Sequence, residues 1–150
     1  MFDLTSLLTS IPELIATIDD RIRRSRGTER ALLVELKTNI AVIQAFAEDE
    51  ASINRVIEAL EVTTLKDATE SGFDFKSVKK GEVKEETVGD NRQLATYVGW
   101  STERLFLNIY EKIKVLQKII RIDTDKNVRK QVRLNNMLLL MALLVKHIES

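Results

Sequence analysis

Apolar residues recur every three or four positions through most of the chain, which is the spacing of one face of an α-helix. The first run follows Ser10 and Glu13, an S-x-x-E capping box, with Pro12 in the first turn. This pattern predicts a helix that begins there and ends near Gly27, with four arginines near the end where the helix dipole favours cations. Residues 2–9 are either an extra turn or a leading helical segment. The apolar face consists of Ile11, Leu14, Ile15, Ile18 and Ile22.

The middle of the chain continues the helical pattern with one interruption. Thr28 can cap a helix that extends to about Ala47, and Asp49 can cap a further helix that ends near residues 63–72. The polar residues between them form either a turn or a polar interruption, so the pattern leaves open whether 28–70 is one helix or two. The apolar seams are Leu33, Leu36, Ile40, Ile43 and Ala47, followed by Ile53, Val56, Ile57 and Leu60.

The helical period disappears over residues 71–93, where ten of the twenty-three residues are charged. The segment alternates loosely between apolar and polar residues and has Lys80 and Gly81 at its centre, as a small β-hairpin would. A charged loop fits the same residues. Both interpretations stay open at this point.

Two long helices are predicted after the charged segment. Asp90 and Gln93 form a capping pair for a helix over about 91–121, which Gly99 would bend. After a short turn, the last helix is expected over about 126–148. The main seams are Phe106, Ile109, Ile113, Leu116 and Ile120 in the first of these helices and Leu134, Leu138, Met141, Val145 and Ile148 in the second.

The last helix contains nine consecutive apolar residues, 137–145, which is more than one amphipathic face. A helix that is apolar all round must be buried all round. It therefore lies either at the centre of the bundle or at its edge, where a second copy of the chain would cover it. The wide apolar surface of the preceding helix favours the second copy.

These patterns predict a single all-α domain over residues 1–150: an up-and-down bundle of four to five helices, with a charged loop or small hairpin at about 71–93. The length is sufficient for one domain with a sizeable core. With 44% hydrophobic and 31% charged residues, five glycines and one proline, the composition is that of a folded, helix-rich protein.

The composition also excludes several kinds of chemistry. There is no cysteine, so disulfides, thiolate nucleophiles and cysteine-ligated zinc are ruled out. His147 is the only histidine, which excludes metal sites with two or three histidines and makes a Ser-His-Asp triad improbable so near the end of the chain. The glycines form no phosphate-binding motif. We therefore expect no catalytic, cofactor-binding or metal-binding residues and no cofactor.

The sequence predicts a cytoplasmic protein that does not enter a membrane. The N-terminus carries an acidic residue and no early lysine or arginine, unlike a secretory signal. A helix of nine residues is about 14 Å long, against a hydrocarbon core of about 30 Å. The apolar run is therefore too short to span a bilayer.

The most function-like feature of the sequence is a basic face on the last helix. Lys126, Arg129, Lys130 and Arg133 follow helical spacing, and residues 112–133 contain eight basic and two acidic residues, a local net charge of +6. Such a face can bind an anion or the phosphates of a nucleic acid. Against this stand a total charge of zero and the lack of aromatic residues among these cations, so nucleic acid is the alternative partner.

A carboxylate-metal enzyme is the remaining alternative. Acidic residues cluster at 48–50 and 82–86, but the acids within predicted helices are isolated, and no Glu-x-x-His motif occurs. Helix capping and solvated turns explain most of these carboxylates without a metal.

We predict a non-catalytic helical bundle that acts as a self-associating protein-interaction or regulatory module. The homodimer would form through the last two helices, whose surplus apolar area needs a partner. The residues expected on the self-association face are Leu107, Val115, Leu140 and Leu144. The sequence does not indicate which other protein is bound.

Overall fold

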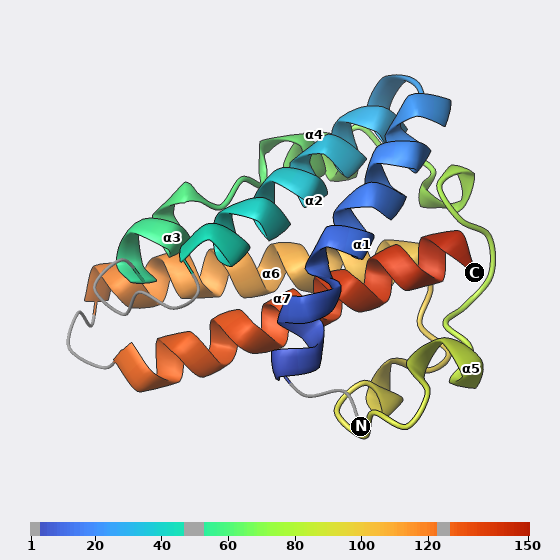
Figure 1. The fold of residues 1–150 in the computed structure, drawn as a ribbon. Helices are drawn as coiled ribbons and strands as arrows, with labels where there is room; N and C mark the ends of the chain where they lie inside the picture. The colour runs from blue at the N-terminus through green and yellow to red at the C-terminus, as the bar shows by residue number, and fades with distance from the viewer. Residues whose placement is uncertain (1–3, 47–52, 123–126) are drawn as a thin grey trace.

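The computed structural model describes residues 4–46, 53–122 and 127–150, and over these residues it contains helices and turns without a β-strand (Figure 1). The all-α prediction is confirmed. The α-helices are α1 (Leu4–Arg24), α2 (Gly27–Phe46), α3 (Ile53–Ala59), α4 (Thr63–Glu70), α5 (Glu85–Val88), α6 (Thr102–Ile122) and α7 (Asn127–Glu149). Two short 3₁₀ turns, η2 (Phe75–Ser77) and η3 (Ala95–Tyr97), complete the described elements.

Helix α7 is the central element of the bundle. It lies beside α6 and runs in the opposite direction, α1 crosses over it, and α2 also packs against it (Figure 1). Helices α3 and α5 also contact α7, so five helices surround it. Residues 137–145 are apolar on every side because each side of this stretch faces another part of the same chain.

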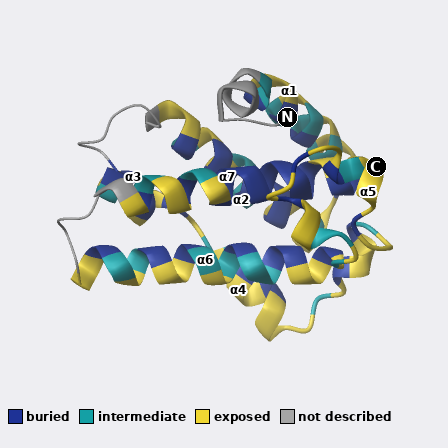
Figure 2. Ribbon diagram, turned by 90° about the horizontal axis from the view of Figure 1, so that it is seen from below, coloured by how far each residue is buried: buried dark blue, intermediate teal, exposed yellow. Residues whose placement is uncertain are grey.

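A single chain buries the apolar run completely. All nine residues of 137–145 are buried, and the dark segment of α7 in Figure 2 shows how little of this stretch reaches the surface. Leu140 and Leu144 are both 0% exposed. The prediction that these two leucines lie on a free self-association face is therefore wrong, because α1, α2, α3 and α6 already cover the helix. None of the helices in the described ranges is both long and apolar enough to cross a bilayer.

Helix α1 begins at Leu4, which agrees with the alternative that residues before Ser10 form a leading helical segment. Pro12 therefore lies inside the helix, at an exposed position, and its predicted place in the first turn is wrong. Helix α6 begins at Thr102, about ten residues later than predicted. Gly99 has a φ of +88°, a left-handed conformation that ends any helical course through this point. The Asn91 side chain accepts hydrogen bonds from the backbone N–H groups of the two residues that precede η3, at 2.9 and 3.3 Å, and so makes a local turn.

The charged segment is a loop with short helical turns and not a hairpin about Lys80 and Gly81. The backbone of Val83 pairs instead with the residues before α6, through Val83 N to Trp100 O and Gly99 N to Val83 O, both 2.9 Å. Phe75 from η2 is buried, with its ring 5.4 Å from that of Phe106. These contacts fix the segment over the start of α6, so it is part of the folded domain.

The described part of 28–70 lies in α2, α3 and α4, and two polar side chains of α2 hold the connection between α3 and α4 in place. The buried Asn39 amide donates to the carbonyl of Glu61 and accepts from its N–H, both at 2.8 Å. The Glu35 carboxylate accepts from the N–H groups of Thr64 and Leu65, at 2.8 and 3.1 Å. Glu35 thereby caps α4, whose own N-cap position, Val62, has no side-chain acceptor.

Candidate α6–α7 binding groove

The predicted basic face of α7 is only partly exposed. Arg129 and Arg133 are exposed, whereas Lys130 is 1% exposed and its Nζ lies 3.3 Å from Asn54 Oδ1 of α3. Lys130 precedes the buried Leu134 by one helical turn, so it lies on the inward side of α7. The prediction that Lys130 joins the anion-binding face is therefore wrong. Lys126 lies outside the described residues.

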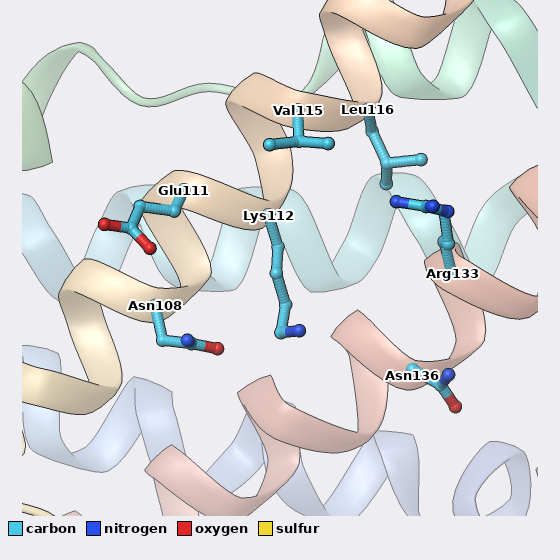
Figure 3. A pocket seen from close by; sticks show the side chains of 7 residues that line it. All are labelled: Asn108, Glu111, Lys112, Val115, Leu116, Arg133 and Asn136. Carbon is cyan, nitrogen blue, oxygen red and sulfur yellow. The ribbon is translucent and has the colours of Figure 1, made fainter.

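A groove of about 270 Å³ separates the outer edges of α6 and α7. Figure 3 shows the side chains that line it from both helices. From α6 they are Asn108, Glu111, Lys112, Val115 and Leu116, and from α7 they are Arg133 and Asn136. The groove thus brings together two predicted site residues from different faces, Val115 and Arg133, which the sequence assigned to separate functions.

Exposed apolar residues are most frequent on α6 and α7, and one of them, Val115, lines the groove. Across the ranges that the structure describes, four large hydrophobic residues are markedly exposed, and three of them belong to α6 and α7. These are Val115 at 46%, Ile122 at 87% and Val132 at 53%; the fourth is Val34 of α2 at 44%. Leu107, also predicted on the self-association face, is half-buried. The outer surface of α6 and α7 is therefore the place where apolar side chains meet solvent.

One polar atom of the groove is shielded without a partner. Asn108 Oδ1 is buried, and no hydrogen-bond donor satisfies it. An unsatisfied buried acceptor costs about 1–3 kcal/mol, so this amide is a weak point of the interface between α6 and α7. Asn39, the other asparagine beside an apolar seam, is satisfied by Glu61.

His147 occupies the interior and not the groove. It is 1% exposed, and its Nε2 lies 2.9 Å from Thr102 Oγ1, which is also 2.8 Å from the carbonyl of Lys79. Because the hydroxyl donates its single hydrogen to that carbonyl, it must accept from Nε2–H. Nδ1 then carries the lone pair and has no partner. Burial and, to a smaller extent, the charge of Lys79 lower the pKa of His147.

This buried histidine predicts a dependence of stability on pH. Below its ordinary pKa of about 6.5, His147 gains a proton more readily in the unfolded chain than in the folded one. Its contribution is therefore complete above about pH 6.5 and is lost as the pH falls below that value. We expect the free energy of unfolding, measured by urea titration, to fall between about pH 7 and pH 5 in the wild type. The fall should be smaller in His147→Gln. Equal drops in both proteins would contradict a lowered pKa of His147.

The aromatic residues before α6 form a structural cluster. The rings of Tyr97 and Trp100 meet edge to face, with centroids 4.7 Å apart, and the Arg104 guanidinium lies 3.8 Å from the Trp100 ring centroid. Burial raises the pKa of the Tyr97 hydroxyl. Trp100 thus connects the loop to α6, because its backbone carbonyl accepts from Val83 N–H while its ring faces the Arg104 guanidinium.

Within 4–46, 53–122 and 127–150, no three histidine, aspartate or glutamate side chains come together as a metal site would require. The acidic residues 48–50 lie outside these ranges. Residues 82–86 lie on the loop and α5, where the glutamates are exposed.

No family model matches this sequence, and neither a curated protein nor a solved structure matches it. Function is therefore inferred from the geometry of the α6–α7 groove and from the chemistry of the residues around it.

Proposed function

We propose that the protein is a non-catalytic interaction or regulatory module of the cytoplasm that binds a protein partner at the α6–α7 groove. The observation that carries this proposal is the groove itself, where exposed Val115 lies beside the cations Lys112 and Arg133. Protein interfaces combine apolar contact with a polar rim in this way. The volume of about 270 Å³ is suited to one or two anchoring side chains of a partner.

The position of His147 supports a non-catalytic role. Its imidazole is 1% exposed and its Nε2–H is used by Thr102, which leaves no route for a substrate to reach that nitrogen. The one side chain of the protein that titrates near neutral pH is thus a structural group.

Self-association of the chain as a homodimer is a second use of the same surface. Val115, Ile122 and Val132 would supply its apolar contacts. In a two-fold interface, each groove would bring two cations, Lys112 and Arg133, and one carboxylate, Glu111. The cations would outnumber the carboxylates, so a different protein with an acidic surface is the better partner.

Nucleic acid is the second candidate partner, because Arg129 and Arg133 are exposed one turn apart on α7. Phosphate contacts of this kind fall steeply in affinity as salt rises. The burial of Lys130 removes one of the four cations expected for such a face.

The proposal is tested by placing a photo-crosslinking amino acid at position 115 or at position 34 in cells that make the protein. Val115 and Val34 are valines of nearly equal exposure, 46% and 44%, so position 34 is a matched control on another face. We expect a discrete protein adduct from position 115 and none from position 34. Equal adducts, or none at position 115, would contradict the proposal. A band of twice the chain mass, formed by the purified protein alone, would instead establish the homodimer.

A further inference from the structure

We infer that the segment bound in the α6–α7 groove is an acidic amphipathic helix, with leucine-like residues on one side and aspartate or glutamate beside them. This inference rests on the proposed function and names its partner by chemistry. It follows from the spacing of the apolar residues around the groove and from the state of the cations there.

The apolar residues have the spacing that a docked helix requires. Val115 and Ile122 are seven residues apart on α6, so they lie on the same side of that helix, about 10.5 Å apart along its axis. A partner helix that lies along the groove would present apolar residues at the same interval, two turns apart. Val132 is a further exposed apolar residue on α7, next in sequence to the groove residue Arg133.

The cations around the groove have no ion-pair partner among the described residues. Lys112, Arg129 and Arg133 form no ion pair with any residue of the described ranges. Between α1 and α2, by contrast, the Arg21 Nε lies 3.1 Å from Glu29 Oε1, and Lys37 pairs with an α1 carboxylate. The side chains that line the groove include two cations, Lys112 and Arg133, and one carboxylate, Glu111. The lining therefore carries a net positive charge, which complements an acidic segment.

The apolar residues favour an acidic helix over nucleic acid. A phosphate backbone would contact Arg129 and Arg133 but would offer no apolar group to Val115 and Ile122. Base stacking would need aromatic side chains, and Tyr97 and Trp100 are engaged with each other at the start of α6.

The inference is tested by selection from an unbiased library of displayed helix-forming peptides of about 18 residues, long enough to extend over the two turns between Val115 and Ile122. The purified full chain is the bait. Enriched peptides are then synthesised with a fluorescent label, and their affinity is measured by anisotropy. The proteins compared are the wild type, Arg133→Glu, Val115→Asp and a matched control, Lys66→Glu, which changes an exposed lysine of α4.

We expect the enriched peptides to carry apolar residues at intervals of three, four and seven, with net negative charge. Arg133→Glu should weaken their binding by about tenfold or more, and Lys66→Glu should leave it within about twofold. A peptide in which the acidic residues are replaced by lysine should regain affinity for Arg133→Glu. Circular dichroism and melting temperature establish beforehand that each variant is folded; Val115→Ala replaces Val115→Asp if the aspartate variant is not.

The other outcomes separate the inference from the proposed function. Enriched peptides that are neutral or basic, yet weakened by Val115→Asp, would overturn the acidic helix and leave the groove as a binding site. Peptides unaffected by either groove substitution, or no enrichment at all, would overturn both. Tighter binding of a labelled 20-nucleotide oligouridylate than of any peptide, lost in Arg133→Glu, would overturn the inference in favour of nucleic acid.

Discussion

Replacing Leu140 by alanine is expected to lower the free energy of unfolding by about 3–4 kcal/mol. Leu140 is 0% exposed and lies on α7, which packs against α1, α2, α3, α5 and α6. The substitution removes buried methyl groups and leaves a cavity that rigid neighbouring helices cannot fill. Urea unfolding followed by circular dichroism measures the effect, and an unchanged slope against urea would show that the midpoint shift reports stability alone.

Val132→Ala is the matched control for this prediction, because Val132 lies on the same helix and is 53% exposed. Its effect should remain within about 0.5 kcal/mol. If Leu140→Ala left the unfolding of a single chain unchanged and only dissociated a dimer, Leu140 would belong to an interface between copies, and the central position of α7 would be wrong.

Asn39→Ala is expected to lower the free energy of unfolding by about 3 kcal/mol. The substitution leaves the N–H and the carbonyl of Glu61 without the amide that satisfies both at 2.8 Å. Asn39 itself is 3% exposed, so water cannot readily replace it. The loss should appear in thermal and urea unfolding alike, because the connection between α3 and α4 is fixed to α2 through this pair.

Gln44→Ala provides the control, since Gln44 is an exposed polar residue of the same helix. We expect its effect to be within about 0.5 kcal/mol. A cost of less than about 1 kcal/mol for Asn39→Ala would show that the Glu61 backbone finds other partners, and the role assigned to Asn39 in breaking the helix would not hold.

Much of the architecture follows from apolar periodicity. The seam of α2 predicted from Leu33, Leu36, Ile40 and Ile43 is buried, and Ala47 of the same seam lies outside the described residues. The seam of α6 is buried over all five of its predicted positions. Such faces can be recognised in a sequence because burial of one side of a helix requires apolar residues every three or four positions.

The helix boundaries that the sequence does not predict depend on contacts between residues far apart in the chain. The pairing of Val83 with Gly99 and Trp100 delays the start of α6, and no local spacing reveals that pairing. The break between α3 and α4 depends on Glu35 and Asn39, which lie 22 to 30 residues away from the backbone groups that they bind. Local propensity cannot anticipate partners supplied by another element.

The groove was only partly predictable. Val115 and Arg133 were each identified as surface residues, but their meeting depends on how α6 and α7 are rotated against one another. Lys130 is the clearest example of a site residue that the sequence predicts wrongly. Its charge favours an exposed position, whereas its position on α7 places it inside. The spacing of Lys130 from Leu134, one helical turn, is the feature of the sequence that indicates its inward position.

A single chain completes the burial of 137–145 in α7, and the α6–α7 groove stays open to solvent. Native-state hydrogen exchange at two widely different protein concentrations tests it most directly. We predict that the amides of 137–145 are among the slowest to exchange and open with the same free energy at both concentrations. Faster exchange in α7 than in α2, or protection of 137–145 that rises with protein concentration, would contradict the claim, because a second copy would then be completing this helix.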